Sequence, residues 1–275
     1  MGMKDSYAGG GGKPGKDLRQ NLEEWLDGLP DLGPQPDAEP PLDTQPDVPP
    51  DVPPLRPQQL LPALGLFRPR TGGHRDGPGG GGAGSGGGGL GTGGGARGGA
   101  QRSIAGSSRT AGRAAAAAYA LRTGNVQLLQ ELGLDYDSLR SNSDVADVAR
   151  QIMVAACGPL PDGTIEEDEQ RVVAAQVAQF VLEANTDDGP PAPEEIVRET
   201  IACIIFEAVS NETAAMLHNG ERPAWATAGA ERLMRETAQA LALRVHLSPD
   251  GPTPTEFSEA IARGIETMRE IWGKG

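Results

Sequence analysis

The chain has 275 residues and a formal net charge of −14, with two cysteines and three histidines. These five residues are spread along the chain with no pair at metal-ligand spacing, which excludes zinc-binding and disulfide-rich scaffolds, and we expect no metal and no cofactor. No stretch reaches the roughly 18 to 20 apolar residues of a membrane span, and the N-terminus lacks the apolar core of a signal peptide. The sequence therefore predicts a soluble, cytoplasmic protein without a membrane partner.

Glycine and proline divide the chain into two parts. Residues 1–100 hold 27 of the 40 glycines and 15 of the 24 prolines. A segment with this composition and few large apolar side chains cannot bury enough surface to offset the cost of ordering its backbone. We therefore predict a long, disordered, Gly/Pro-rich N-terminal region followed by one folded domain over residues 103–275, which is an ordinary domain size.

Residues 1–17 are predicted to form a flexible, basic, Gly-rich arm. Because Gly2 is small, removal of Met1 would leave the Gly2 amine as the free terminus, so Gly2 is a candidate site of modification. The string from Gly2 to Ser6 also fits the loose M-G-x-x-x-[ST] pattern of N-myristoylation. An unmodified flexible terminus is the alternative.

The first predicted helix covers residues 18–29, LRQNLEEWLDGL. Its apolar residues recur at helical spacing and form a single stripe, made of Leu18, Leu22, Trp25, Leu26 and Leu29. A helix of this length is marginal alone in water. We therefore predict a docking element that folds on an apolar groove, either of a partner protein or of its own C-terminal domain.

Residues 30–102 are predicted to be a disordered linker in two parts. Repeated prolines, as in DVPPDVPP, favour an extended acidic spacer, and residues 72–99 are nearly all glycine. Residues 20–55 carry nine acidic residues and no base, whereas residues 56–122 carry nine arginines and one aspartate. The acidic and the basic block can attract each other or pair with a partner.

The arginines of this region raise an alternative function. Disordered Arg/Gly segments bind RNA through charge and stacking, so the candidates for nucleic-acid contact are Arg97, Arg102, Arg109 and Arg113. Only one RGG triplet is present, and no Phe or Tyr lies between Phe67 and Tyr119. A cationic linker or a partner-docking segment is therefore the favoured interpretation, and the acidic charge of the folded part argues against nucleic-acid binding there.

From about residue 103 the sequence is rich in alanine and has helical periodicity, which predicts an all-α bundle of about seven helices. Thr164 and Glu167 form the Thr-x-x-Glu pattern of a capping box, and Thr253 with Glu256 gives the same start signal for the last helix. The run IACIIF, residues 201–206, is apolar on all sides and predicts a central buried helix.

No catalytic constellation is visible in the sequence. The acidic cluster at residues 166–169 is explained by the start of a helix, where acids favour the positive end of the dipole. The chain has no nucleophile elbow, no phosphate loop and no dinucleotide fingerprint. We therefore expect a protein that is not an enzyme and has no catalytic residues.

The layout of the whole chain resembles a known family. It combines a start MG followed by SYAGG, a Pro-rich spacer, a Gly block, an Arg-bearing Ala helix with Arg109 and Arg113, and the phrase GPLPDGTIEEDEQR at residues 158–171. In these features the chain resembles the QatB family, a component of the bacterial Qat anti-phage defence system. The phrase at residues 158–171 is the most specific part of the resemblance.

The resemblance implies a non-enzymatic subunit in antiviral defence that acts through protein–protein interaction. Its implied partners are an ATPase, a 7-cyano-7-deazaguanine-synthase-like enzyme and a TatD-like nuclease. On this basis we expect the flexible N-terminus to engage the deazaguanine-synthase-like enzyme or to be modified by it at Gly2. The alternatives are a nucleic-acid-associated adaptor that binds through residues 56–122, and a scaffold protein of some other helical family.

Overall fold

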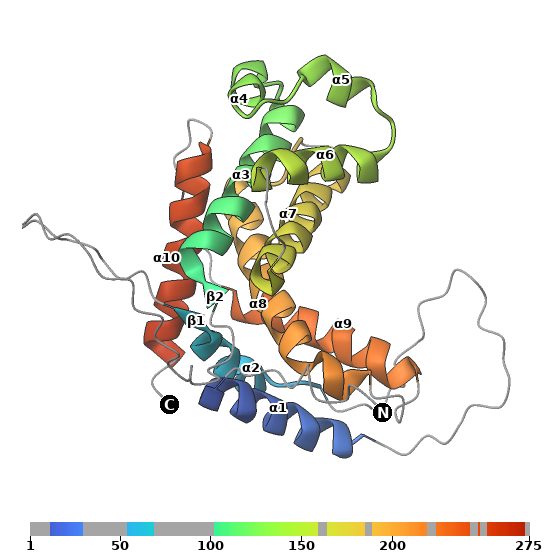
Figure 1. Ribbon diagram of the computed structural model, residues 1–275, viewed down its shortest axis with the longest axis vertical. Coiled ribbons are helices and arrows are strands. Elements are labelled where there is room, and N and C mark those ends of the chain that lie inside the picture. The colour runs from blue at the N-terminus through green and yellow to red at the C-terminus, as the bar shows by residue number, and fades with distance from the viewer. Residues whose placement is uncertain are drawn as a thin grey trace, which may run out of the picture.

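The computed structural model describes residues 12–29, 54–68, 102–158, 164–184, 189–218, 224–242, 247 and 252–272. Within these ranges the chain forms ten α-helices, one 3-10 helix and two strands of two residues each. The all-α class predicted from the sequence is therefore confirmed. In Figure 1 the long helices stand roughly upright, and α1, α2 and α9 close the lower end of the body.

The described part of the C-terminal domain contains eight helices where the sequence predicted about seven, because the turn after Asp135 is a helix of its own. These helices are α3 (Ile104–Thr123), α4 (Val126–Glu131), α5 (Tyr136–Ser141), α6 (Val145–Cys157), α7 (Ile165–Glu183), α8 (Pro193–Leu217), α9 (Ala224–Leu241) and α10 (Pro254–Trp272).

The capping patterns predicted from the sequence form hydrogen-bonded caps at the N-termini of α7 and α10. The Thr164 hydroxyl accepts a hydrogen bond from the Glu167 amide at 3.2 Å, and the Glu167 carboxylate accepts one from the Thr164 amide at 2.8 Å. Thr253 and Glu256 exchange the same two bonds at 3.2 and 2.8 Å. Each pair satisfies backbone N–H groups that the first turn of a helix leaves without intrahelical partners.

Helix α3 lies at the centre of the bundle and packs against α6, α7 and α10. Its buried side is mostly alanine, and residues 114–118 are all alanines with at most 1% of their surface exposed. Side chains this small let neighbouring helices approach closely. At Gly112 a Cβ atom would lie 2.7 Å from the Ser258 backbone nitrogen of α10, so only glycine fits at this crossing.

Helix α8 is the second core helix, and the prediction that residues 201–206 are buried is confirmed. Every residue from Ile201 to Ile205 is at most 3% exposed. Among the described residues, α8 is the one helix long and apolar enough to cross a membrane, but 67% of its most apolar window is buried inside the protein. A buried core helix of a globular protein can have the same length and apolar composition as a membrane-spanning helix.

Two N-terminal segments pack onto this bundle. The first is α1 (Gly12–Asp27), and the second, residues 54–68, contains α2 (Pro57–Leu60), the 3-10 helix η1 (Leu61–Leu66) and strand β1 (Phe67–Arg68). Strand β1 pairs in parallel with β2 (Arg102–Ser103), so that Phe67 lies opposite Arg102 and Arg68 opposite Ser103. This parallel pairing holds residues 68 and 102, where the intervening segment begins and ends, next to each other on the bundle.

The structure corrects two predicted boundaries. Helix α1 begins at Gly12, inside the predicted arm 1–17, because Pro14 falls in the first turn, where its missing N–H is not needed. Residues 54–68 and 102 are not part of a disordered linker. Leu60, Leu64 and Phe67 are at most 2% exposed, since this short stretch carries enough large apolar side chains to join the core. The rest of the predicted disordered region lies outside the described residues.

The crossing of α3 and α10 gives a stability prediction. We expect Gly112→Ala to lower the free energy of unfolding by about 1–3 kcal/mol, because the added methyl group meets backbone of α10 that has no room to move. For a domain of this size each kcal/mol lowers the melting midpoint by about 2–4 °C. Thermal unfolding followed by circular dichroism measures the effect.

Gly28→Ala is the matched control, because its Cβ would meet neighbours only at ordinary contact distances of 3.4 and 3.6 Å. We expect this variant to keep the wild-type midpoint. An equal midpoint for both variants would contradict the close crossing.

Candidate functional site

The apolar stripe of α1 is buried against the protein's own bundle. Leu18, Leu22, Trp25 and Leu26 belong to the main hydrophobic core, and Leu29 packs on its edge while partly exposed. Of the two docking surfaces that the sequence left open, the structure places this stripe on the chain's own domain. A partner can reach these side chains only after α1 leaves the bundle.

Two glycines allow α1 to lie unusually close to its neighbours. A Cβ atom at Gly15 would lie 2.9 Å from the carboxyl carbon of Glu212 on α8. A Cβ atom at Gly65 of η1 would lie 2.7 and 2.8 Å from ring atoms of Pro14. The first two turns of α1 are therefore fitted between α8 and η1 with no space for larger residues.

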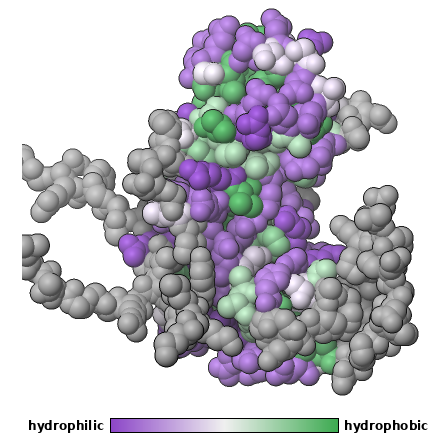
Figure 2. Space-filling view, turned by 45° about the vertical axis from the view of Figure 1, so that its right-hand side comes forward, coloured by the Kyte–Doolittle hydropathy of each residue, from purple (hydrophilic) through white to green (hydrophobic). Residues whose placement is uncertain are grey.

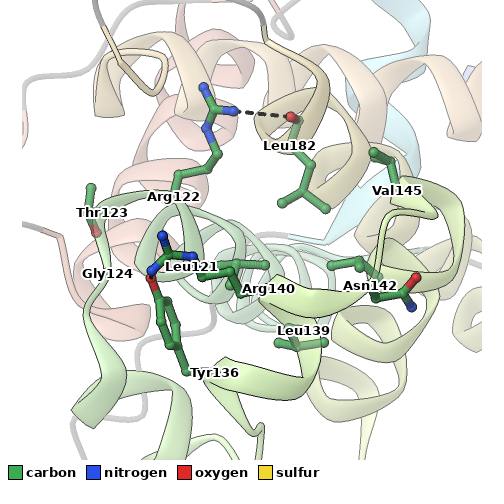
Figure 3. Close-up of a pocket in the computed structure, with 11 residues that line it drawn as sticks. Leu121, Arg122, Thr123, Gly124, Tyr136, Leu139, Arg140, Asn142, Val145 and Leu182 are labelled. Atoms are coloured by element: carbon green, nitrogen blue, oxygen red, sulfur yellow. Dashed lines mark hydrogen bonds between the residues drawn. The ribbon is translucent and has the colours of Figure 1, made fainter.

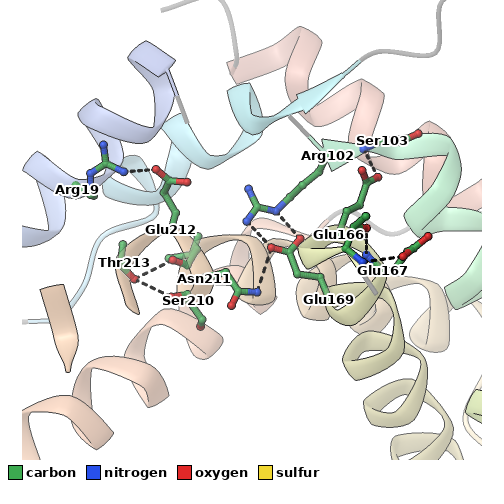
Figure 4. Close-up of polar contacts among 12 residues, drawn as sticks. Arg19, Arg102, Ser103, Glu166, Glu167, Glu169, Ser210, Asn211, Glu212 and Thr213 are labelled. Carbon is green, nitrogen blue, oxygen red and sulfur yellow. Dashed lines mark hydrogen bonds and ion pairs between the residues drawn. The ribbon is translucent and has the colours of Figure 1, made fainter. Parts of the chain in front are cut away.

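Polar contacts fix the register of α1. The Arg19 guanidinium forms an ion pair with Glu212, whose side chain is only 6% exposed (Figure 4). Farther along, Asn21 donates to the Gln59 carbonyl at 3.3 Å, and Gln59 donates to the Asn21 carbonyl at 3.4 Å. These pairs specify one position of the helix along the groove, which apolar contacts alone would define less sharply.

The charges of α1 run against its helix dipole. Lys13 and Lys16 lie in its N-terminal half, where the first turn has no acid, and Glu23, Glu24 and Asp27 lie in its C-terminal half, where the last turn has no base. Helices are stabilised by the opposite arrangement. Docking on the bundle therefore supplies the stability that the isolated segment lacks.

A buried ion pair ties β2 to α7 and α8 (Figure 4). Arg102 donates two hydrogen bonds to the Glu169 carboxylate, at 2.6 and 2.5 Å, and both side chains are less than 10% exposed. Asn211 donates a third bond to Glu169 at 3.1 Å. Removing one partner of such a pair leaves an uncompensated buried charge, which typically costs about 3–5 kcal/mol.

The arginines proposed for nucleic-acid contact do not form one surface among the described residues. Arg102 is buried in the ion pair with Glu169. Arg113 is half-buried and donates to the Ala155 carbonyl in the last turn of α6 at 3.0 Å. Arg109 is exposed on α3, and Arg97 lies outside the described residues. The nucleic-acid interpretation thereby loses Arg102 as a surface contact, because that side chain serves the fold.

Gly2, the predicted modification site, also lies outside the described residues. The described chain begins ten residues later, at Gly12, which is the first residue of α1. The anchoring of α1 therefore fixes the position of Gly12, the residue that follows the N-terminal arm, defined here as residues 1–11.

A cavity of about 470 Å³ lies between α3, α5 and α6 (Figure 3). Arg122 on its wall donates to the backbone carbonyls of Ala184 and Gly189 at 2.9 and 3.4 Å. This guanidinium therefore satisfies carbonyl groups at and just after the C-terminal end of α7. Arg140 donates to the Tyr136 hydroxyl at 3.1 Å and lies over that ring. None of the described residues lining this cavity is a carboxylate, a thiol or an imidazole.

A smaller cavity of about 280 Å³ lies at the base of the arm. It is lined mainly by apolar groups of three separate segments: Pro14 of α1, Leu61, Pro62 and Gly65 of η1, and Trp272 of α10, with Lys13, Asp17 and Gln58 completing the wall. This cavity lies beside the first turn of α1, where the described chain begins.

The two cysteines differ in accessibility. Cys203 is 2% exposed on α8, and burial, with smaller contributions from Glu199 and Glu207, raises the pKa of its thiol to about 12. Cys157 at the end of α6 is half-buried, and desolvation raises its pKa, with Arg171 and Arg113 opposing the shift. Across the described ranges, no group of three His, Cys, Asp or Glu residues is placed to hold a metal ion.

Comparisons of the chain with protein-family models, with curated proteins and with solved structures returned no match. The function is therefore argued from the geometry of this chain.

The sequence did not reveal the residues that hold α1 and β2 in place. Glu212, Gly65 and Asn211 lie far from α1 or β2 along the chain, and each is unremarkable in its own segment. The one local signal was the apolar stretch QLLPALGLF at residues 59–67 inside the predicted linker, a candidate docking patch whose site on the protein the sequence did not indicate.

The fit between Pro14 and Gly65 gives a test of α1 docking. We expect Gly65→Val to speed amide hydrogen exchange in α1 at least tenfold, because the new side chain occupies the place of the Pro14 ring. Exchange in α3 should stay slow, since α3 does not contact this position. Peptide-resolved hydrogen exchange by mass spectrometry measures both helices.

Gln20→Ala, at an exposed position of the same helix, is the control and should leave exchange unchanged. If Gly65→Val and Gln20→Ala behave alike, the anchoring of α1 described above is wrong.

Thiol labelling tests the environment of the cysteines. The thiolate is the reactive form, so a raised pKa slows labelling at neutral pH and labelling accelerates as the pH rises. We expect a chromogenic disulfide reagent to titrate one thiol, Cys157, in the native protein at pH 8 and the second only after unfolding. Rapid labelling of two thiols in the native state would contradict the burial of Cys203.

Proposed function

We propose that this protein is a non-enzymatic subunit of a bacterial anti-phage defence assembly of the kind to which QatB belongs. In this proposal the helical bundle is a rigid base, and the N-terminal arm engages a deazaguanine-synthase-like enzyme or is modified by it at Gly2. An ATPase and a TatD-like nuclease are the further partners of the assembly.

The observation that supports this proposal best is the anchoring of α1. Pro14, Gly15 and Arg19 fix the start of the helix on α8 and η1. Residues 2–11 can extend at most about 35 Å from that point, at about 3.5 Å per residue. A free amine on a short tether with a fixed origin suits presentation to the cleft of a partner enzyme.

The proposed chemistry needs only the Gly2 amine from this chain. An α-amine has a pKa of about 8, so a useful fraction is neutral and nucleophilic near neutral pH. The partner supplies a deazapurine with an activated carboxyl carbon. An amide bond forms between the Gly2 nitrogen and that carbon, while the activating group leaves and the amine loses one proton.

The second candidate, a nucleic-acid adaptor acting through residues 56–122, is less well supported. Of its four candidate arginines, Arg102 is enclosed in an ion pair and Arg113 is bonded to a backbone carbonyl. Arg109 is the one described candidate at an exposed position, and Arg97 lies outside the described residues, so fewer of the named arginines are available for phosphate contacts.

Mass spectrometry on the co-expressed assembly tests the proposal. We expect intact and N-terminal peptide masses to show an increment on Gly2 when a deazaguanine-synthase-like enzyme is co-expressed with this chain, and none when the protein is expressed alone. Gly2→Glu, which retains Met1, should lose the increment and keep the melting midpoint. A bare terminus together with no stable complex would overturn the proposal, whereas a stable complex with a bare terminus would leave engagement without modification.

A further inference from the structure

We propose that a pocket beside α6 binds a small organic anion that carries an apolar body. This inference does not depend on the proposed function, since it concerns the helical bundle and not the N-terminal arm. The pocket has a volume of about 680 Å³ and is formed by α3, the turn after α4 and the second half of α6. We call it the α6 pocket, and the residues of its wall that bear on the ligand are Arg113, Leu132, Leu134, Arg150, Val154 and Ala155.

The wall of the α6 pocket is mainly apolar. Leu132 and Leu134 come from the turn after α4, and Val154 and Ala155 come from α6. Val154 is 55% exposed, although it is a large hydrophobic residue. Figure 2 shows separate hydrophobic areas on a mainly hydrophilic face, some of them at the upper end of the body, where Figure 1 places α4 to α6. A ligand body that covers Val154 removes apolar surface from water, which favours binding.

Two guanidinium groups line the same pocket. Arg113 comes from α3 and Arg150 from α6, and none of the described residues in the wall is a carboxylate. Arg150 is paired with Asp147, but its side chain is 62% exposed, and an exposed pair of this kind contributes little stability. Arg150 is therefore available to a ligand. In a chain with a net charge of −14, a pocket with two arginines and no acid favours an anion.

The guanidinium of Arg113 lacks one hydrogen bond. A terminal nitrogen of this group donates to the Ala155 carbonyl at 3.0 Å. Its Nε atom is buried and has no hydrogen-bond partner, a state that only one other side-chain atom of the described chain shares, Ser210 Oγ. Buried donors without an acceptor are rare in native proteins, because they lose water and gain nothing in return. A carboxylate or sulfonate oxygen beside Arg113 supplies the missing acceptor, since guanidinium groups bind such anions with paired N–H bonds.

The environment of Cys157 shows the same positive charge. Cys157 precedes Gly158, which is part of the pocket wall. Burial raises the pKa of the Cys157 thiol, and the charges of Arg171 and Arg113 oppose this rise. Two guanidinium groups are therefore close enough to the end of α6 to favour a negative group there. Arg171 is itself paired with the exposed Asp168, so Arg113 is the cation that faces the pocket.

The size and the wall of the α6 pocket together specify the class of ligand. Pockets of about 300–1,000 Å³ hold small molecules, and they typically combine an apolar wall with a few charged groups that fix the orientation of the ligand. A bare inorganic anion leaves the apolar wall uncovered, and an uncharged hydrocarbon leaves both guanidinium groups without an acceptor. The ligand that uses both features is a carboxylate or a sulfonate on an acyl chain or an aromatic ring system.

Fluorescence titration of the full-length protein tests the inference. The probe is anilinonaphthalene sulfonate, and the comparison probe is phenylnaphthylamine, which has the same rings without the sulfonate. We expect one equivalent of the sulfonate probe to bind, at least tenfold more tightly than the uncharged probe. Decanoate, a carboxylate on an acyl chain, should displace it.

Two variants of the wall have matched controls. Val154→Asp adds a negative charge at an exposed position, and we expect it to weaken binding of the sulfonate probe at least tenfold. Its control is Ile271→Asp, because Ile271 is 56% exposed in the last turn of α10, at the opposite end of the body in Figure 1. Arg113→Met removes the guanidinium and should also weaken binding at least tenfold, with the exposed Arg140→Met as its control.

The melting midpoint of each variant is measured beside its affinity, and if Arg113→Met is destabilised, Val154→Asp decides. Preference for the sulfonate probe, lost in the two wall variants and kept in the two controls, supports the α6 pocket. Absence of saturable binding, equal affinity for the two probes, or equal losses in wall and control variants overturns it. The titration needs no partner protein, so each of these outcomes leaves the proposed function untouched.

Discussion

The close approach of helices to α3 is the constraint on which the rest of the structure depends. Apart from Ile104 at its start, its buried residues are alanine, glycine and serine, so α3 contributes little side-chain volume to the core. The large apolar groups come from the elements around it, for example Phe257 on α10 and Ile152 on α6, both fully buried. Close packing on a central helix with small side chains increases the number of dispersion contacts, but it leaves no space for added atoms.

The N-terminal segments complete this core and add the buried charges that position them. Leu18, Leu22, Leu60 and Phe67 are at most 2% exposed, which makes them as much a part of the core as the bundle helices. Helix α1 and strand β2 each meet a carboxylate of the bundle, Arg19 at Glu212 and Arg102 at Glu169. Because desolvation of such ions offsets much of their attraction, we attribute to these pairs the choice of register more than net stability.

The sequence predicted those parts of the fold whose cause is local. Capping pairs such as Thr164 with Glu167, the apolar run of α8 and the alanine periodicity of α3 each act within one segment, so they were visible without the fold. Residues 54–68 were assigned to the linker because composition was averaged over a long Gly/Pro-rich stretch, although the apolar stretch at residues 59–67 within it was visible as a docking patch. The pairing of Arg102 with Glu169 joins positions 67 residues apart, and no local pattern distinguishes a buried arginine from a surface one.

Because the charges of α1 are arranged unfavourably for its helix dipole, its stability depends on its docked position on the bundle. An isolated segment with lysines at the positive end and acids at the negative end of its dipole, with Pro14 and Gly15 in its first turns, has little tendency to be helical. The helix exists because the bundle holds it, so helix formation and docking are one event. The same contacts therefore decide both whether α1 is a helix and where the arm begins. Through Gly15, Gly65 and Glu212, the packing of the core thus determines where α1 begins on the bundle.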